Sequence, residues 1–374
     1  MPKLSEFKNP QQRLEFLENK LKIKLTNLKK VYVDDEKSTH CENLIGGVSL
    51  PVGVAGPLKL RGKYVEGEYY VPLATTEGAL VASVNRGCKV ISLSGGTSVY
   101  THRVGTTRGP VFYTESLEKS KNFYRWVKEN EIRLGKIGEE TSSHLKFQKL
   151  DIRMLANYVF VRFYFDTQDA MGMNMVTIAT QNMVEFIEKE TGIKCLSLAG
   201  NFDIDKKPAW LNFINNRGFK AWAEVTIIEK IVKDILKTTP EKIFDLWLAK
   251  CMIGSAMSGS LGFNAHFANV VAAFFAATGQ DLAHVVEGSL GITTTKVLSD
   301  GSLYASVYLP AVMLGTVGGG TGLKTQTEVK SIIGVKKSVE FTEILAGVVL
   351  AGEISLLASL AEGSLAKAHQ KLGR

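Results

Sequence analysis

A stretch of thirty residues without any charged side chain constrains the fold of this chain more than any other feature. Residues 251–280 contain no Asp, Glu, Lys or Arg, and a membrane-spanning helix needs only about 20 apolar residues. Asn264, His266 and Asn269 interrupt the stretch, however, and leave an apolar run of ten residues at 270–279. Small side chains fill the first part, which favours close packing in a protein core over a membrane helix: Gly254, Ser255, Ala256, Ser258, Gly259 and Ser260.

The length of 374 residues exceeds the roughly 150 residues of a typical domain, so two or three compact units are expected. With 45% hydrophobic and 22% charged residues, the composition is that of an ordinary globular protein, and the chain should fold throughout.

The formal net charge of +8 would suit nucleic acid, a membrane surface or a small polyanion. The basic residues are spread out, and residues 20–30 are typical of a solvated amphipathic helix, so neither nucleic acid nor a membrane is expected as a partner.

The N-terminal residues lack the apolar core of a signal peptide, so the expected location is the cytoplasm. The four cysteines, Cys41, Cys88, Cys195 and Cys251, stand far apart without a CxxC pair. This spacing argues against a structural zinc site, and no metal is expected. We predict that all four are reduced, buried thiols.

Periodicity, glycine and proline divide the chain into segments. Residues 1–45 predict a small helical unit with a broken apolar stripe. The Gly- and Pro-rich residues 46–57 predict an extended, loop-rich segment, and a helix is expected over 77–90. Beyond residue 201, the turn SDGS at 299–302 predicts a hairpin between strands at 293–298 and 303–309. A last helix is expected over 341–369.

Residues 109–200 show a compact alternation of strands and helices. Strands are expected at 110–113, 158–165 and 195–198, with one helix over 115–129 and another between the last two strands. Apolar residues at helical spacing mark that second helix, and Gly192 is placed to end it. The resulting β-α-β-α-β order suggests an inserted α+β unit of ferredoxin-like type.

Two glycine-containing motifs are candidate ligand-binding sites. GTVGGGTG at 315–322 matches neither the P-loop nor the dinucleotide fingerprint, so neither assignment is favoured. DAMGMNM at 169–175 stands at the start of a predicted helix, where free N–H groups and the helix dipole favour an anion. Its methionines, Met171, Met173 and Met175, are also typical of core residues that fill gaps, and periodicity alone favours that interpretation.

DIDKKP at 203–208 sets two carboxylates against two lysines. Exposed, the segment would be a polar turn, which the sequence alone favours. Partly buried, it would hold an ammonium beside carboxylates, an arrangement that can stabilise a developing oxyanion. Glu77, Asp281 and His369 are lone titratable residues among small or apolar neighbours, and each alone is more typical of a cap or of the surface.

Ten motifs occur in one order and connect these isolated residues. They are ENLIG (residues 42–46), PVGVAGPL, ATTEGALVAS, NRG, TTRGPV, DAMGMNM, GN-x-x-x-DKKP, GSAMSGSLG-x-NAH-x-AN, GQD and GTVGGGT. From about residue 40 to the end, this series resembles the 3-hydroxy-3-methylglutaryl-coenzyme A reductases, and ENLIG is similar to the ENVIG element of the class I form. The resemblance is to soluble prokaryotic or archaeal members.

The resemblance implies an NADPH-dependent enzyme of isoprenoid biosynthesis that reduces (S)-3-hydroxy-3-methylglutaryl-coenzyme A, by four electrons, to (R)-mevalonate and coenzyme A. It implies an α+β fold. A large coenzyme-A-binding domain would comprise residues 46–108 and 213–374, with a ferredoxin-like NADP-binding domain inserted at 109–200, a connecting catalytic loop at 201–212 and the helical unit at 1–45.

The resemblance also implies residue roles. Lys206 would stabilise the oxyanion, Glu77 would donate a proton in aldehyde reduction, and Asp281 would couple to both. His369 would protonate the leaving coenzyme A thiolate. The remaining implied contacts are Arg108, Asp205, Lys207, Lys250 and Asn269 for the hydroxymethylglutaryl group, Ser83, Asn85 and Arg86 for coenzyme A, and Asp169, Met171, Gly172, Met173, Asn174, Met175, Gly318, Gly319 and Gly320 for the nicotinamide cofactor.

The match departs from the family where Ser142-Ser143-His144 replaces a common Ser-Arg-Phe and removes a cation. NADPH is therefore expected with NADH as an alternative, unless Arg374 compensates. Family members form dimers with active sites between subunits, and a tetramer is a further possibility.

Three rival interpretations are less favoured. ENLIG argues against NAD-dependent oxidation of mevalonate, and the presence of Glu77, Lys206, Asp281 and His369 together argues against a non-enzymatic coenzyme-A-binding scaffold. A basic nucleic-acid binder would need a basic motif interleaved with aromatic residues, which the sequence lacks.

Overall fold

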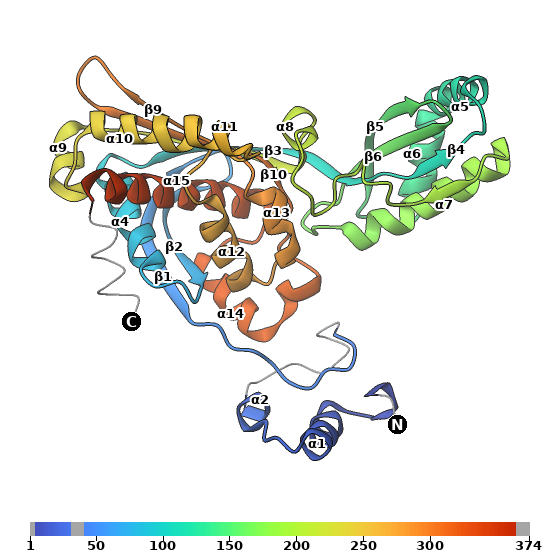
Figure 1. Ribbon diagram of the computed structural model, residues 1–374, viewed down its shortest axis with the longest axis horizontal. Coiled ribbons are helices and arrows are strands. Elements are labelled where there is room, and N and C mark those ends of the chain that lie inside the picture. Colours follow the sequence, from blue (N-terminus) through green and yellow to red (C-terminus); the bar gives the residue numbers. More distant parts are fainter. Residues whose placement is uncertain (1–3, 31–40, 364–374) are drawn as a thin grey trace.

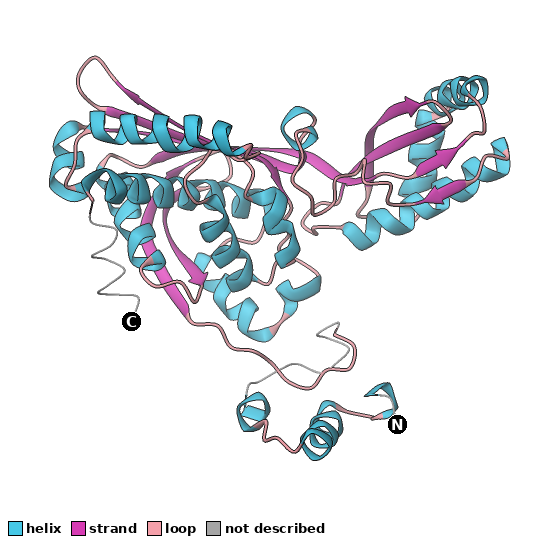
Figure 2. Ribbon diagram, viewed as in Figure 1, coloured by secondary structure: helices cyan, strands magenta, loops and turns pink. Residues whose placement is uncertain are grey.

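The structure is a computed structural model that describes residues 4–30 and 41–363 (Figure 1). A sheet of ten strands runs through the molecule in the order β7-β4-β6-β3-β8-β10-β9, with β1, β2 and β5 attached beside this path. Helices pack against the sheet at both ends, whereas α1 and α2 lie apart from the main body (Figures 1 and 2). The mixed α and β architecture expected from the sequence is confirmed.

The larger part of the sheet packs with the neighbouring helices to form the main hydrophobic core. Its strands pair antiparallel, except for a short parallel contact between β1 and β3. Alternating burial along β10 gives the two-residue period of a strand that covers a core with one face. The strands are β1 (Val52–Arg61), β2 (Glu66–Ala74), β3 (Thr97–Arg108), β8 (Arg217–Ile227), β9 (Ile292–Val297) and β10 (Leu303–Val312).

The long helix α15 (Ser338–Glu362) lies in this core beside α4 (Leu80–Leu93) and α12 (Phe267–Thr278). By length and composition α15 could span a membrane, but 83% of its apolar window is buried inside the protein. It is therefore a core helix of the kind that is hydrophobic on all sides. Gly87 of α4 allows the tightest approach, because a Cβ there would lie 1.9 Å from the Ala351 carbonyl oxygen of α15.

β3 connects the two parts of the sheet. Its first half pairs with β8, and its end, from Thr106 to Arg108, pairs with β6. The register shifts between Arg103 and Gly105, where Gly105 adopts a φ of 108° that favours glycine. The strand therefore changes partners at a glycine bulge and delivers Arg108 to the junction.

The smaller part of the sheet has its own hydrophobic core. The chain order is strand, helices, two strands, helix, strand, and the strands are arranged β7-β4-β6-β5, all antiparallel, which is the ferredoxin-like βαββαβ arrangement. The elements are β4 (Val111–Tyr113), α5 (Leu117–Glu129), α6 (Glu131–Glu139), β5 (Lys146–Leu155), β6 (Tyr158–Asp166), α7 (Met173–Thr191) and β7 (Cys195–Ser197).

The remaining helices are short. Two of them, η2 (Val232–Leu236) and η3 (Leu248–Gly254), are π-helices, and η1 (Leu4–Glu6), η4 (Leu282–His284) and η5 (Gly319–Gly322) are 3₁₀ turns. The α-helices are α1 (Pro10–Leu21), α2 (Thr26–Lys30), α8 (Leu211–Ile214), α9 (Glu229–Ile231), α10 (Pro240–Trp247), α11 (Ser255–Ser258), α13 (Val285–Gly288) and α14 (Lys324–Ile333).

The local predictions differ from the structure in identifiable ways. The hairpin β9–β10 is confirmed, and α7 ends at Gly192 with a left-handed φ of 72° as expected. The segment expected as a loop at 46–57 instead enters β1 at Val52, because a bulge between Ala55 and Leu58 accommodates Pro57. β5 and α6 were not predicted, since the exposed charges of β5 hide its alternation.

The prediction of buried cysteines is only half right. Cys88 and Cys251 are buried, whereas Cys41 is exposed and Cys195 is half-buried, and all four are free thiols. Burial raises the pKa of the Cys88 and Cys251 thiols to about 12, so these two behave as inert core residues.

Candidate active site

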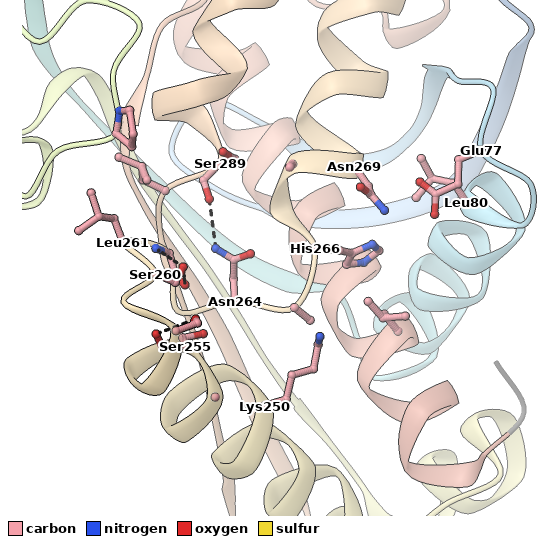
Figure 3. Close-up of a pocket in the computed structure, with 18 of the residues that line it drawn as sticks. Glu77, Leu80, Lys250, Ser255, Ser260, Leu261, Asn264, His266, Asn269 and Ser289 are labelled. Atoms are coloured by element: carbon pink, nitrogen blue, oxygen red, sulfur yellow. Dashed lines mark hydrogen bonds between the residues drawn. The ribbon is translucent and has the colours of Figure 1, made fainter. Parts of the chain in front are cut away.

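A cavity of about 1290 Å³ opens beside the start of α4 and beneath the loop that precedes α12. We call it the serine cavity. Figure 3 shows Lys250 extending from its helix toward this loop, and Glu77 and Asn269 on the opposite side from Ser260. The cavity combines hydroxyls, amides and one ammonium group, and is lined by residues that include Glu77, Ser83, Lys250, Ser255, Ser258, Ser260, Asn264, His266, Asn269 and Ser289.

The walls of the serine cavity are held by buried hydrogen bonds. The carboxylate of Glu353, fully buried in α15, accepts hydrogen bonds from the backbone N–H groups of Ala265 and His266, each at 2.7 Å, and from the Thr293 hydroxyl at 2.5 Å. These contacts fix the loop that carries His266 above the cavity. Lys250 enters from the π-helix η3, and such wide turns are frequent at functional sites.

One prediction about this region was wrong. The small residues at 254–260 were expected to pack within the core, but several of them line the serine cavity, and Met257 is 84% exposed. The small side chains leave an open space in place of a close helix contact. The apolar run that follows does form the buried helix α12, as expected.

A second cavity of about 550 Å³, which we call the glycine cavity, lies where α7 begins. It is lined by residues 170–175, 279–281 and 315–321 together with Lys206, except that Thr316 is not part of the wall. Gly172 caps α7 with a φ of 87°. The first N–H groups of α7 lack carbonyl partners within the helix, and the helix dipole is positive there, so the cavity suits an anionic or amide group.

Close backbone packing shapes the glycine cavity. A Cβ at Gly315 would lie 2.4 Å from the Met171 backbone nitrogen, and a Cβ at Gly279 would lie 2.2 Å from the Gly320 carbonyl oxygen. By contrast, Gly318 and Gly319 have positive φ angles and open space around them. The glycines therefore bring three backbone segments together and leave open space beside Gly318 and Gly319.

Lys206 and Asp281 form an ion pair at the edge of the glycine cavity. The Lys206 Nζ lies 2.9 Å from the Asp281 Oδ2, and both side chains are a little over one-third exposed. The hydrogen bond to Asp281 raises the pKa of the Lys206 ammonium. Burial alone would raise the pKa of Asp281, but hydrogen bonds from Lys206 and the Ala283 N–H outweigh it, and its pKa is lowered. The lysine is thus kept protonated.

The loop that carries Lys206 is strained and partly buried. Asn201, Ile204 and Lys206 all have φ angles near 60°, a conformation that non-glycine residues rarely adopt. Asp203 is 1% exposed, and burial raises the pKa of its carboxyl group. The Arg108 guanidinium lies 3.4 Å from the Asp203 carboxylate and 3.8 Å from the Asp205 carboxylate. DIDKKP is therefore the partly buried arrangement, and the exposed polar turn that the sequence favoured was wrong.

Beneath the loop lies a buried ion cluster of Arg217, His284 and Glu287, whose side chains are fully buried, together with Asp205. The Arg217 guanidinium contacts Glu287 and lies 3.1 Å from the Asp205 Oδ1. Asp205, His284 and Glu287 offer potential metal ligands within 4.8 Å of one another. Arg217 already neutralises these carboxylates, so the cluster fits a structural ion network better than a metal centre.

Sequence reasoning missed this cluster. None of the ten motifs includes Arg217, His284 or Glu287. The three residues lie on three elements, which are β8, η4 and α13. The one available signal was that His284 and Glu287 follow Asp281 at positions i+3 and i+6, which places them on one face of a helical turn.

The predicted residues divide between the two cavities. Glu77, Ser83, Lys250 and Asn269 line the serine cavity, whereas Lys206, Asp281, residues 171–175 and residues 318–320 line the glycine cavity. Within one chain, the described residues therefore do not gather the expected catalytic set in a single cavity. His369 and Arg374 lie outside the described residues.

Four predicted binding residues are engaged elsewhere. Arg86 donates to the Ser355 carbonyl and to Ser359 of α15, and the Asn85 Oδ1 accepts the Gly56 N–H at 3.0 Å. The Asp169 Oδ1 accepts hydrogen bonds from the N–H and hydroxyl of Ser338, at the start of α15, and the Lys207 Nζ donates to the Asp205 carbonyl. These contacts stabilise the walls of the sites.

Comparison with known proteins identifies the family. The model of the hydroxymethylglutaryl-coenzyme A reductase family matches residues 9–374. The chain belongs to this family. It is 49% identical over 368 residues to the 3-hydroxy-3-methylglutaryl-coenzyme A reductase of Methanothermobacter thermautotrophicus, covering 97% of this chain and 92% of that protein. It is 48% identical over 373 residues to the reductase of Methanocaldococcus jannaschii, with the same coverage. The chain is therefore a member of an oxidoreductase family.

A solved structure shares the fold. The class II 3-hydroxy-3-methylglutaryl-CoA reductase of Streptococcus pneumoniae, bound to NADPH, superimposes with a TM-score of 0.73 and covers 96% of this chain and 98% of its own, at 19% identity. At this identity the likeness establishes the fold. The class I assignment expected from ENLIG is not confirmed by it.

Proposed function

We propose that the protein reduces 3-hydroxy-3-methylglutaryl-coenzyme A to mevalonate and coenzyme A with two equivalents of NADPH, in isoprenoid biosynthesis. The observation that carries this proposal is the Lys206–Asp281 ion pair, held at 2.9 Å on the edge of the glycine cavity beside the start of α7. Family membership supplies the reaction, and this pair supplies the charge that the reaction needs.

We assign oxyanion stabilisation to Lys206. When NADPH is bound in the glycine cavity it supplies the hydride, and the thioester oxygen then becomes negative. An ammonium that Asp281 keeps protonated meets this charge without reorganisation, and such preorganised donors are typically worth about 3–4 kcal/mol. Collapse of the hemithioacetal breaks the C–S bond and releases the thiolate, and the aldehyde then undergoes a second reduction at the same carbon.

Two protons complete the reaction. We propose that His369 gives one to the coenzyme A thiolate, a task for which imidazole is well suited near neutral pH, and that Glu77 gives one to the alkoxide of mevalonate. Glu77 lines the serine cavity, where its carboxyl group is exposed and Asn269 and Lys250 line the same space. The acyl group and coenzyme A would occupy this cavity.

Charged side chains support the assignment of the acyl site. Lys250 in the serine cavity and Arg108 and Lys207 beside the Lys206 loop would oppose the free carboxylate of the hydroxymethylglutaryl group, with Asp205 and Asn269 accepting and donating hydrogen bonds. Ser83 would meet coenzyme A from α4, where Arg86 and Asn85 stabilise the wall. Residues 171–175 and 318–320 would meet the nicotinamide cofactor, which we assign to the unit at 109–200.

We further propose a class I enzyme, on the strength of ENLIG at 42–46, that acts as a dimer with active sites between subunits. An apolar hollow of about 560 Å³ beside Glu77 supports a subunit contact, because exposed apolar surface of this kind marks interaction sites. It is lined by Leu50, Ala268, Ala272, Ala276, Leu282 and Val285 among others. Such a contact would bring Glu77 of one chain toward Lys206 of another.

The test follows the absorbance of NADPH with purified protein and 3-hydroxy-3-methylglutaryl-coenzyme A. We expect two NADPH oxidised per mevalonate and a loss of about 10²–10³ in kcat in Lys206→Ala. Lys121→Ala, at an exposed position of α5, is the matched control and should leave the rate unchanged. Turnover only in the direction of mevalonate oxidation with NAD would replace the proposed direction, and no turnover in either direction would refute an enzymatic role.

A further inference from the structure

Two fully buried titratable residues behind the proposed site have no role in the mechanism above. His284 and Glu287 follow Asp281 on the turns η4 and α13, and both side chains are 0% exposed. A buried carboxylate and a buried imidazole are costly unless they are paired. Their contacts therefore indicate what they hold in place.

Glu287 joins three separate segments through one oxygen atom. Its Oε1 lies 2.8 Å from the His284 Nδ1, accepts a hydrogen bond from the Arg217 guanidinium, and accepts one from the Lys206 backbone N–H at 3.3 Å. The last of these bonds is made by a residue whose φ is 57°. Glu287 thus holds the strained backbone from which the Lys206 ammonium extends.

His284 joins the same cluster to Asp281. Its Nε2 lies 3.6 Å from the Asp281 Oδ2 and has no hydrogen-bond partner among the described residues, and its Nδ1 also lies 3.8 Å from the Asp205 Oδ1. The groups that face the ring are thus Asp281, Asp205 and Glu287, with Arg217 and Lys206 bound to those same carboxylates. Ionised carboxylates only accept hydrogen bonds, so each ring nitrogen faces a hydrogen-bond acceptor.

We propose that His284 and Glu287 are positioning residues for the reduction: Glu287 sets the backbone of Lys206, and His284, through Nε2, directs the Asp281 carboxylate at the Lys206 ammonium. This inference rests on the proposed function. Neither residue lines the glycine cavity itself, and each contacts a residue that does. They act through the ion pair, where a displacement of about 1 Å can lower a rate by about 10²-fold.

Two substitutions separate the contacts of His284. In His284→Asn, the amide nitrogen takes roughly the place of Nδ1 and keeps the contact with Glu287, but nothing reaches Asp281. In His284→Gln, the amide nitrogen takes roughly the place of Nε2 and keeps a donor toward Asp281. We measure kcat and KM for 3-hydroxy-3-methylglutaryl-coenzyme A and thermal unfolding of each variant. His102→Gln, on an exposed position of β3, is the control.

We expect His284→Asn to lower kcat by about 10- to 100-fold with KM within about twofold of the wild type, and His284→Gln to recover most of the loss. Equal kcat in all variants, or equal losses accompanied by a matching rise in KM, would overturn the inference, because a residue that only fills space cannot distinguish the two amides. If His284→Asn does not fold, Glu287→Gln replaces it, and an unchanged kcat there would overturn the inference.

Turnover of the wild-type protein distinguishes a failure of the proposed function from a failure of the positioning roles of His284 and Glu287. Absence of turnover in the wild-type protein would overturn the proposed function and this inference with it. Turnover in the wild type together with unchanged variants would overturn the inference alone.

Discussion

At the scale of single residues, we expect the Lys206–Asp281 pair to make catalysis depend on pH. The hydrogen bond to Asp281 raises the pKa of Lys206, so removing it should let the ammonium lose its proton at lower pH. We expect Asp281→Asn to move the alkaline limb of the pH profile of kcat to lower pH. The control is Asp300→Asn in the exposed hairpin turn. An alkaline limb that stays in place in Asp281→Asn would show that Lys206 does not govern it.

The same pair contributes little to folding stability. Because the pKa of Asp281 is lowered, its contribution is present above the unfolded pKa of about 3.9 and is lost as the pH falls through the folded value. Because the pKa of Lys206 is raised, its contribution is present below the unfolded value of about 10.4 and is lost as the pH rises through the folded value. Both side chains are over one-third exposed, so the pair is worth about 0–1 kcal/mol.

Residue identity alone could not decide whether DIDKKP is an exposed polar turn or a partly buried loop that holds an ammonium beside carboxylates. The motif order pointed to Lys206, but whether its segment is exposed depends on Arg108 and Arg217, which lie about one hundred residues before and ten residues after it. His284 and Glu287 were missed for a related reason, because Glu287 also binds Arg217 and the Lys206 backbone, which are distant in the sequence. Burial is a property of the whole fold, and a local pattern cannot supply it.

At the scale of elements, Gly315 determines how the glycine loop packs on the start of α7. An added Cβ would lie 2.4 Å from the Met171 backbone nitrogen, and backbone cannot move aside as a flexible side chain can. We expect Gly315→Ala to raise the KM for NADPH by about tenfold or more and to lower the melting temperature, because overpacking costs about 1–3 kcal/mol.

Gly322→Ala is the matched control for this prediction. A Cβ at Gly322 would meet nothing within 4 Å, and the residue does not line the glycine cavity. Its KM for NADPH and its melting temperature should stay close to those of the wild type. Equal effects of the two substitutions would mean that glycine flexibility, and not the close approach at Gly315, shapes the loop.

Elements were predictable where the periodicity was local. Helix α7 and the hairpin β9–β10 carry their own signals, an apolar stripe ended by Gly192 and a turn of SDGS. Strand β5 carries none, because it exposes Lys146, Lys149 and Arg153 along an edge, where charge protects against aggregation. Without β5 the ferredoxin-like order could be suggested only as an incomplete alternation.

At the scale of the whole molecule, one chain divides the proposed catalytic residues between two cavities. Glu77 and Lys250 line the serine cavity, whereas Lys206 and Asp281 line the glycine cavity. The motif series names the residues but not the subunit that supplies each one, and only the family resemblance implied active sites between subunits. The separation nevertheless makes a quantitative prediction, because an active site assembled from two chains can be restored by two different inactive ones.

We expect Glu77→Gln and Lys206→Ala each to be nearly inactive alone but to complement one another when expressed together. In a mixed dimer one site carries both substitutions and the other carries neither, so each mixed dimer keeps half of its sites. Random pairing makes about half of the dimers mixed, and the activity should reach about one quarter of the wild type. If both residues act within one chain, every site in the mixture carries one substitution, and the coexpressed protein will be as inactive as either variant alone.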